Sequence, residues 1–409
     1  MKDQSPLGCR QRRHLFVGES ALHCGRRHLD DLIPVDESQA VMGLDGDAVE
    51  QVLFGNLQDV LNRAELVAGR TENRRADCQR LVGDGSSFSH VLLVLSVNEA
   101  KPTYAATSMQ VVVTGSSGPI GRALCSHLAG AGHHVVRVVR RPVGPGEVAL
   151  AWDPEAGTID AHGLEGADAV VHLAGAGVGD GRWTESRKRI LVESRVRSTA
   201  LLTRTLAGLD HRPRVLVSAS AVGFYGDRSD EIVTEESPPG DDFLASLCVR
   251  WEAETAPAAE AGVRVVCART GLVLSREGGA LPKLLPLFKL GLGGRFGSGA
   301  QWWSWITLDD EIRAIAWVLD NDIRGPVNLT APNPVTNREF TRILGAVLSR
   351  PARLPVPRFG PRLLLGSELA DALLFTSARV QPAVLESSGF AFSNSDLEIG
   401  LRDILQPSS

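Results

Sequence analysis

Short apolar runs alternate with amphipathic stretches along residues 109–348 of this chain. The run QVVVT at 110–114 is rich in β-branched residues and predicts a buried strand, and residues 122–131 have the apolar spacing of an amphipathic helix. Further strands are expected at 134–139, 148–152, 169–173, 214–217 and 263–268, and further helices at 184–207 and 242–261. Regular alternation of this kind predicts an α/β fold built on a doubly wound parallel sheet.

The same patterns divide the chain into four parts. Residues 1–108 show no succession of strand and helix signals, so we hypothesise that the natural protein starts at Met109 and that these residues are non-native; the alternative is a poorly ordered N-terminal extension. Residues 109–275 are expected to form a nucleotide-binding domain, and residues 276–350 a substrate-side region that carries late elements of the same fold. Repeated prolines then precede a small helical C-terminal domain at 351–409, with helices expected at about 363–374 and 396–404.

Composition narrows the classes of function. The chain has 409 residues, is 43% hydrophobic and 22% charged, and carries a net charge of −5, so a basic nucleic-acid-binding surface is not expected. Its longest aliphatic run, 90–97, is much shorter than the ~20 residues of a membrane-spanning helix. Six cysteines without a CxxC pair and the lack of a secretory leader favour a cytoplasmic protein. The cysteine and histidine cluster at 9–28 matches no zinc spacing, so no metal site is expected.

A glycine-rich loop follows the first predicted strand. Its sequence, GSSGPIG at 115–121, stands between a strand and a helix, as in Rossmann-like dinucleotide-binding folds. Gly115 permits the tight turn, Gly118 lets the backbone approach a pyrophosphate, and Gly121 lets the helix pack on the strand. The amides at the start of the helix would face the phosphates. The expected cofactor contacts in this loop are Gly115, Ser116, Gly118, Pro119, Ile120 and Gly121.

The second strand ends in Arg140 and Arg141, at the position that distinguishes the two nicotinamide cofactors. Arginine can bind the 2′-phosphate of NADP, whereas an acidic residue there would bind the ribose hydroxyl of NAD, so the sequence favours NADP(H). The alternative is that both arginines are solvated loop charges. From the fold we also expect Asp153 near the adenine, and the segment Leu173, Ala174 and Gly175 along the cofactor.

Several motifs resemble the extended short-chain dehydrogenase/reductase family, which includes nucleotide-sugar epimerases and dehydratases. They are TGSSGPIG at 114–121, VVHLAGA at 170–176, VSASAVGFYG at 217–226, RTGLVL at 269–274 and ITLDD at 306–310. A narrower resemblance, carried by GRWTESRKRILVESRVRST at 181–199, DFLASLCVRWEAE at 242–254 and the C-terminal pieces RLLLG, VQP and GFAFS, is to an atypical epimerase-like subfamily with a C-terminal domain of unknown function. The wider family also implies that a homodimer is one expected assembly.

The sequence departs from this family at its usual catalytic pair. The resemblance implies Tyr-x-x-x-Lys, in which the ammonium group lowers the tyrosine pKa for proton transfer. The only tyrosines are Tyr104 and Tyr225, and neither is followed by lysine four residues on. If Glu252 is aligned with the acid that follows the pair, Leu244 and Cys248 occupy the two positions. The usual acid/base is therefore absent.

Three hydroxyl groups are candidates for the reaction centre. Ser218 and Ser220 lie at the strand end where the family keeps a hydroxyl that binds substrate, and Tyr225 follows them. We name all three as candidate catalytic residues. For Tyr225 the alternative is a structural and substrate-lining role, which the resemblance implies for a tyrosine before glycine.

Basic residues recur on the helix expected at 184–207. Arg187, Lys188 and Arg195 follow at helical spacing, so some of them could face the cofactor or a phosphate-bearing substrate, and the alternative is a solvated face. Ser194, which belongs to the narrower resemblance, is included among the expected cofactor contacts.

These observations lead to an expected function with an open alternative. The leading hypothesis is an NADP(H)-binding, epimerase/dehydratase-like oxidoreductase or isomerase that acts on an unidentified small-molecule substrate, with a sugar as one candidate. The missing catalytic pair keeps open a catalytically silent, NADPH-sensing regulatory protein, which the subfamily resemblance links to cell division. A purely structural protein is a third hypothesis.

Overall fold

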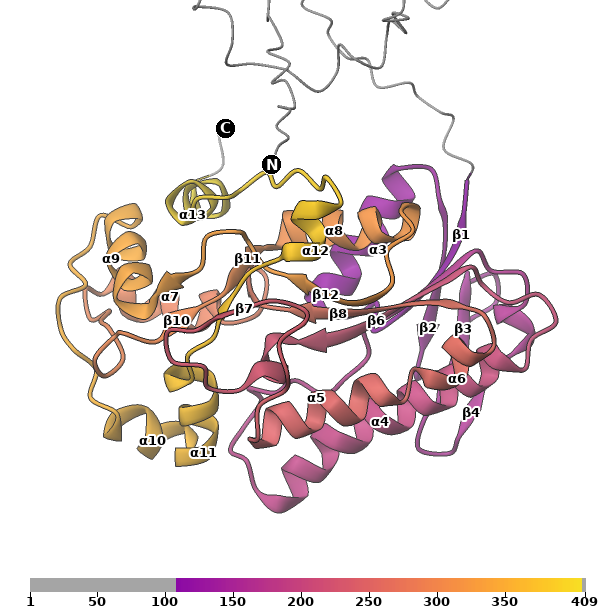
Figure 1. The fold of residues 1–409 in the computed structure, drawn as a ribbon, viewed down its shortest axis with the longest axis horizontal. Coiled ribbons are helices and arrows are strands. Elements are labelled where there is room, and N and C mark those ends of the chain that lie inside the picture. Colours follow the sequence, from indigo (N-terminus) through magenta and orange to yellow (C-terminus); the bar gives the residue numbers. More distant parts are fainter. Residues whose placement is uncertain (1–107, 407–409) are drawn as a thin grey trace, which may run out of the picture. The chain divides into compact units, whose positions relative to one another are not determined.

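An eight-stranded sheet forms the centre of the protein (Figure 1). The computed structural model describes residues 108–406, so the hypothesis on the N-terminal extension and the cysteine and histidine cluster at 9–28 lie outside the described residues. The strands of the sheet are β1 (Gln110–Thr114), β2 (His134–Val139), β3 (Ala149–Asp153), β4 (Thr158–Ile159), β5 (Ala169–His172), β6 (Val215–Ala221), β8 (Arg264–Thr270) and β12 (Gly325–Leu329).

The strand order is β12-β8-β6-β5-β1-β2-β3-β4, and every neighbouring pair is parallel except β3 and β4. Chain order runs outward in opposite directions from β1, toward β2 on one side and toward β5 on the other. This arrangement confirms the doubly wound sheet. In such sheets ligands bind beyond the carboxyl ends of the strands at the point where the order reverses, which here lies between β1 and β5.

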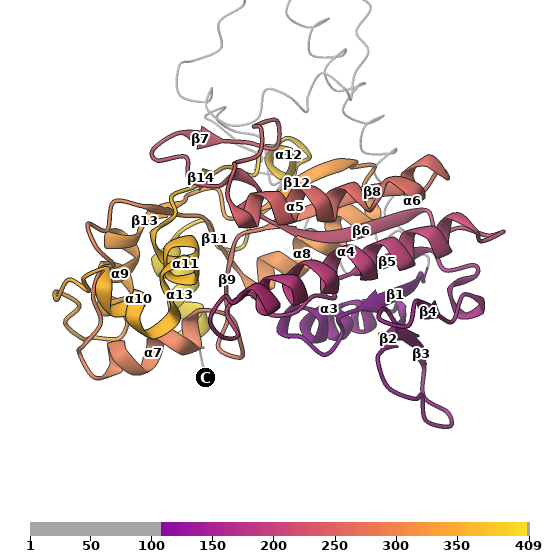
Figure 2. The ribbon, with the colours of Figure 1, turned by 90° about the horizontal axis from the view of Figure 1, so that it is seen from below.

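Helices cover both faces of the sheet. One face carries α3 (Pro119–Gly130) and α8 (Leu308–Asp320), and the other carries α4 (Glu185–Ala207), α5 (Phe243–Ala253) and α6 (Ala256–Glu260) (Figures 1 and 2). Because side chains alternate along a strand, Val111 and Val113 of β1 join the cluster around α8, whereas Val112 joins the cluster that includes Leu202 of α4. Strands buried on both faces are continuously apolar, as the sequence of β1 is.

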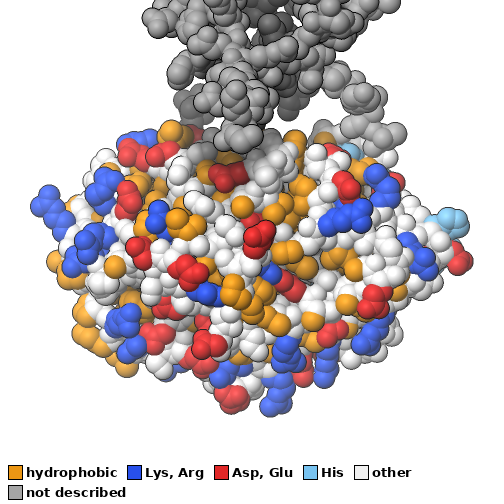
Figure 3. All heavy atoms as spheres, in the orientation of Figure 1, with side chains coloured by type: hydrophobic (Ala, Val, Ile, Leu, Met, Phe, Trp, Pro, Cys, Tyr) orange, Lys and Arg blue, Asp and Glu red, His pale blue; other side chains and the backbone are white. Residues whose placement is uncertain are grey.

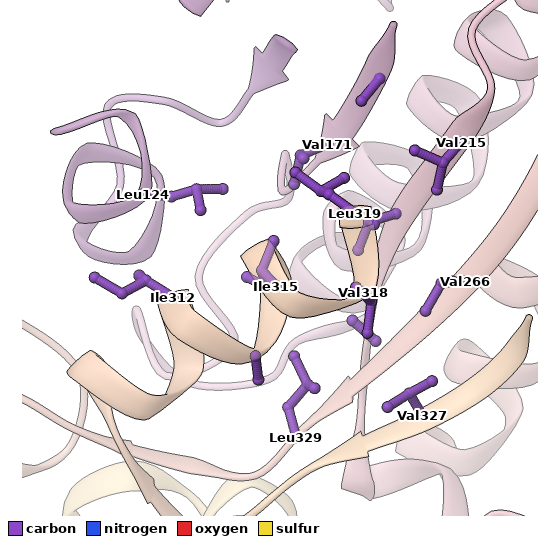
Figure 4. Close-up of a cluster of buried hydrophobic side chains, with 14 of the residues drawn as sticks. Leu124, Val171, Val215, Val266, Ile312, Ile315, Val318, Leu319, Val327 and Leu329 are labelled. Atoms are coloured by element: carbon purple, nitrogen blue, oxygen red, sulfur yellow. The ribbon is translucent and has the colours of Figure 1, made fainter. Parts of the chain in front are cut away.

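Helix α8 begins within the ITLDD segment at 306–310 and packs on the sheet through its apolar face. Ile312, Ile315 and Leu319 are buried against Val171 and Leu329 of the sheet (Figure 4). Thr307 accepts a hydrogen bond from the Asp310 amide and so begins the helix. Since about 25 cal/mol is gained per Å² of apolar surface buried, this cluster is a main source of stability for the sheet.

Two predicted helices are interrupted in the structure. The helix expected at 242–261 divides into α5 and α6 because Pro257 stands in the first turn of α6 and lacks the amide that a continuous helix needs. The helix expected at about 363–374 divides at Gly366, whose φ of +89° ends α10 (Phe359–Leu365). A short helix α11 (Ser367–Ala370) and a π-helical turn η3 (Asp371–Phe375) follow.

A second hydrophobic core is formed by elements from the C-terminal part of the chain. Trp303, Trp305, Phe340 and Leu401 are buried there together, which ties the late segments to the C-terminal helix. The elements of this region are β9 (Leu272–Leu274), α7 (Leu281–Lys289), β10 (Trp302–Trp303), β11 (Trp305–Thr307), β13 (Val335–Thr336), α9 (Asn337–Val347) and α13 (Leu397–Leu405).

The C-terminal segment also reaches the loop that follows β6. Strand β14 (Arg379–Val380) pairs in parallel with β7 (Ile232–Val233), and α12 (Ala383–Ser387) follows it. The Gln381 carbonyl accepts from the Asn328 side chain at 2.9 Å. Residues distant in sequence therefore meet near the carboxyl ends of β6 and β12.

The surface is of mixed charge. Lys, Arg, Asp and Glu side chains are interspersed on the face shown in Figure 3. Within residues 108–406, no helix is long and apolar enough to cross a membrane. Over the same residues, no three His, Cys, Asp or Glu side chains are grouped to hold a metal ion.

Candidate functional site

The glycine-rich loop has the shape that a dinucleotide pyrophosphate requires. Gly115 has a φ of +66°, and a Cβ there would stand 2.6 Å from the backbone of Leu173. A Cβ on Gly121 would stand 2.8 Å from the Cα of Ser116, so this position also excludes any side chain. Gly118 is the N-cap of α3 and makes no side-chain hydrogen bond, so the amides of Ile120 and Gly121 remain available; Pro119, the first helix residue, has no amide hydrogen. The loop and the N-terminus of α3 therefore fit a phosphate-bearing cofactor.

A cavity of about 360 Å³ lies beyond the ends of β2 and β3 and is lined in part by Arg140, Arg141, Trp152 and Asp153. The two arginines differ in their partners. Arg141 donates two hydrogen bonds to the Glu147 carboxylate, at 2.6 and 2.8 Å, and this pairing lowers the pKa of Glu147 to about 2. Arg140 is exposed and forms no salt bridge with any residue between 108 and 406. The cavity thus has one uncommitted guanidinium at its rim.

Asp153 ends β3 at this cavity and closes a turn. Its carboxylate accepts hydrogen bonds from the amides of Glu155 and Ala156, at 2.9 and 3.0 Å. The predicted contact of Asp153 with adenine is not tested by this geometry, since a carboxylate has further acceptor sites.

The segment after β5 lies directly against the glycine-rich loop. The Leu173 amide donates to the Thr114 hydroxyl at 3.2 Å, and Leu173 and Ala174 are the backbone that a Cβ on Gly115 would meet. Ser194 of α4 accepts a hydrogen bond from the Ala176 amide at 3.1 Å. Ser194 therefore positions the segment that carries Gly175, and its predicted contact with the cofactor remains a prediction.

A buried histidine, which the sequence reasoning missed, joins three of these elements. His172 is fully buried, with Nδ1 at 2.7 Å from the Thr114 hydroxyl and Nε2 at 3.0 Å from the Thr199 hydroxyl of α4. Burial lowers the pKa of His172 to about 4, so the ring is neutral near pH 7. A single histidine in the apolar strand AVVH was the available signal. Its role in the structure is to hold the ends of β1 and β5 against α4.

The candidate catalytic hydroxyls share one strand end but differ in their partners. The Ser218 hydroxyl is buried and has no hydrogen-bond partner among the described residues. Ser220 donates to the Glu252 carboxylate at 2.6 Å. Tyr225, at the end of the 3-10 helix η2 (Val222–Tyr225), is fully buried and donates to Asn328 at 2.6 Å.

Arg269 organises the groups around Tyr225. Its guanidinium makes two hydrogen bonds of 2.8 Å to Glu252 and donates to the Tyr225 hydroxyl at 3.1 Å. Burial raises the pKa of Tyr225, so the phenol is the stable form. This geometry favours the structural alternative for Tyr225 and leaves Ser218 as the uncommitted hydroxyl. Arginine inside the strand RVVCART was the sequence signal for this network.

Helix α5 lies where the usual tyrosine and lysine would stand. A Cβ on Gly223 would be 3.2 Å from the Leu244 Cβ, so Leu244 packs against η2. The Cys248 thiol lies 3.7 Å from the Ala221 carbonyl, and burial raises the pKa of Cys248 to about 12. This helix therefore supplies neither a phenol nor a cation at those positions, as the sequence indicates.

Comparisons with known proteins agree with this architecture. Residues 111–329 match the NAD dependent epimerase/dehydratase family, and residues 356–404 match a domain of unknown function, DUF1731. The chain is 45% identical to the epimerase family protein Mb2239 of Mycobacterium bovis over 288 residues, which are 70% of this chain and 94% of that protein. It is 36% identical to the human epimerase family protein SDR39U1, over 73% of this chain and all of that protein. The chain belongs to the NAD dependent epimerase/dehydratase family.

Two solved structures extend the comparison. Human SDR39U1 (isoform 2), crystallised with NADPH, superposes with a TM-score of 0.68 at 34% identity, over 73% of this chain and all of that one. A nucleoside-diphosphate sugar epimerase from Corynebacterium glutamicum has a TM-score of 0.60 at 41% identity, over 73% of this chain and 58% of that one. Both confirm the expected Rossmann-like fold, and the family matches with the similarity to SDR39U1 confirm the epimerase-like character.

Proposed function

We propose that this protein binds NADP(H) and acts as an epimerase/dehydratase-like oxidoreductase or isomerase on a small, sugar-like molecule. The observation that carries the proposal is the loop of residues 115–121, in which two positions exclude any side chain and the following helix begins with open amides. Support comes from the relative of 34% identity that was crystallised with NADPH. A cytoplasmic location and a homodimer are part of the same proposal.

In this proposal, different residues bind different parts of the cofactor and the substrate. Gly115, Gly118 and Gly121 form the cradle for the pyrophosphate, and Arg140 is placed at the cavity rim to bind the 2′-phosphate. The nicotinamide, when bound, supplies hydride transfer. Ser218 is the buried hydroxyl with an unused donor, so it is the group we assign to orient a substrate hydroxyl or carbonyl.

The cofactor preference tests this proposal. Binding of NADPH and NADH to the full chain would be measured by nucleotide fluorescence. Arg140→Ala is expected to reduce the preference for NADPH about ten- to a hundredfold, because a charge-assisted contact to the phosphate is lost. Arg141→Ala should have a smaller effect, because Arg141 is committed to Glu147.

Arg197→Ala is the control, since Arg197 is exposed on α4 and pairs with Glu193. Failure of the wild-type protein to bind either nucleotide would contradict the proposal. Equal affinity for NADPH and NADH, unchanged in Arg140→Ala, would contradict the assignment of the 2′-phosphate.

A second function, a catalytically silent NADPH sensor, is favoured by one observation. The hydroxyls of Ser220 and Tyr225 are both bound to protein partners rather than free for chemistry. Turnover distinguishes the two functions. Net oxidation of NADPH by a ketone, quinone or sugar nucleotide, or conversion of one sugar nucleotide into its isomer, supports the enzyme, and binding of NADPH with neither reaction supports the sensor.

A further inference from the structure

Arg195 of α4 is a buried cation without a carboxylate partner. Only 8% of the residue is exposed, and its Nη1 donates a hydrogen bond to the Leu191 carbonyl at 3.1 Å. Its guanidinium lies over the Trp251 ring, 5.0 Å from the centroid. No salt bridge joins it to any residue in the described range 108–406. Burying an unpaired charge is costly, so such an arginine indicates a ligand that completes its contacts.

Arg269, by contrast, is a buried arginine with a carboxylate partner. It is 4% exposed, and both ends of its guanidinium reach the Glu252 carboxylate at 2.8 Å. Arginine offers five donors in a fixed planar arrangement. Arg269 uses several of them within the protein, whereas one of the donors of Arg195 has a protein partner.

The guanidinium of Arg195 lies beside the segment that follows β5. A Cβ on Gly175 would stand 3.3 Å from its Cζ and 3.4 Å from its Nη2, so the bare backbone of Gly175 allows the close approach. Two residues earlier, Leu173 touches Gly115 of the glycine-rich loop. Arg195 is thus placed just beyond the pyrophosphate cradle, on the side that leads from β5 toward β6.

A second arginine reaches the same segment. Arg187 donates to the Gly177 carbonyl, and its Nε is buried without a hydrogen-bond partner among the described residues. Burial lowers the pKa of Arg195, and the positive charge of Arg187 lowers this pKa further. Two positive charges beside the same segment favour the binding of an anionic or oxygen-rich ligand there.

Arg195 also adjoins the position from which a lysine is missing. Its guanidinium packs on Trp251 of α5, and Trp251 follows Cys248 by three residues on that helix. Cys248 occupies the place where the resemblance expects the lysine of the catalytic pair. A cation is therefore present at this point, carried by α4 instead of α5.

We propose that Arg195 binds oxygen atoms of the nicotinamide half of the dinucleotide and replaces the lysine that α5 lacks. The inference rests on the proposed binding of NADP(H). The oxygens belong either to the pyrophosphate or to the nicotinamide ribose, both of which accept hydrogen bonds from a guanidinium.

The test compares two probes on the full chain. NADPH contains both halves of the dinucleotide, and 2′,5′-ADP contains only the adenosine half. Arg195→Met is expected to weaken NADPH binding ten- to a hundredfold and to change 2′,5′-ADP binding less than twofold. Because the variant removes an unpaired buried charge, the melting temperature of the ligand-free protein should be unchanged or higher. Arg195→Lys should recover part of the NADPH affinity.

Arg197→Met is the matched control, because it makes the same substitution two residues along α4 at an exposed site. Adenosine 2′-phosphate 5′-diphosphate then separates the two oxygen sources: weaker binding to Arg195→Met assigns the pyrophosphate, and unchanged binding assigns the ribose.

Unchanged NADPH affinity in Arg195→Met overturns the inference while leaving the proposed function intact. A parallel loss of both probes with a lower melting temperature also overturns it, since that result assigns a structural role. Failure of the wild-type protein to bind NADPH removes the proposed function itself.

Discussion

The two ends of the candidate site are built from different parts of the chain. At the pyrophosphate end, the backbone forms most of the site: a loop in which Gly115 and Gly121 tolerate no side chain is followed by the N-terminus of α3. At the other end, beyond β6, side chains dominate, and most of them are bound to one another through Arg269 and Glu252. In the first region, adjacent residues of one loop form the binding site. In the second, ligand binding depends on which side chains have no protein partner once the protein has folded.

The largest expected effect belongs to the backbone-dominated end. Gly121→Val places a side chain where even a Cβ would be 2.8 Å from the Cα of Ser116, so the loop must move. We expect NADPH affinity to fall by at least about a hundredfold. Gly130→Ala is the control on the same helix, because a Cβ there meets nothing within 4 Å. It should leave binding unchanged, and an equal loss in both variants would contradict a local role for the loop.

Substitutions in the Arg269–Glu252 network at the other end should lower the stability of the protein. Arg269→Met leaves the partly buried carboxylate of Glu252 without its cation, so the free energy of unfolding should fall by about 3 kcal/mol in chemical denaturation. The double variant Arg269→Met with Glu252→Leu should recover part of this loss, because both charges are removed together. A single variant as stable as the wild-type protein would show that the pair does not hold this region.

We expect the stability of the protein to depend on pH through Glu311. It is buried on α8 and accepts from Thr270 at 2.8 Å, and burial raises its pKa from 4.5 to about 8. The folded protein therefore holds a proton that the unfolded chain releases, and stability falls as pH rises from 4.5 to 8. Glu311→Gln should raise the free energy of unfolding by about 4–5 kcal/mol at pH 8.5 and have little effect at pH 4.

Melting curves across this pH range would check the Glu311 prediction. Glu236→Gln is the control at an exposed position. Equal pH profiles for Glu311→Gln and the wild-type protein would contradict the assignment.

The smallest effect is expected for Tyr225→Phe. The variant removes the hydrogen bonds to Asn328 and from Arg269, which should cost about 1–2 kcal/mol of stability. NADPH affinity should stay within twofold of wild type. Loss of turnover with unchanged stability would instead assign the phenol to the reaction and contradict the structural role.

Much of the fold could be predicted because its signals are local. The β-branched strand β1, the glycine-rich loop and the helix after it are each encoded by adjacent residues, and their succession determines the doubly wound sheet. The breaks at Pro257 and Gly366 were missed, although both residues are visible in the sequence, since helical periodicity runs through them.

The sequence by itself determined the sheet, the dinucleotide-binding loop and the absence of the usual tyrosine and lysine pair. Only the tertiary structure decided which polar groups are already satisfied: Ser220 by Glu252 and Tyr225 by Asn328. It likewise revealed that Arg195 is buried beside Gly175 without a carboxylate among the residues described. The reason is physical, because hydrogen bonding and desolvation depend on distances between residues that lie far apart along the chain.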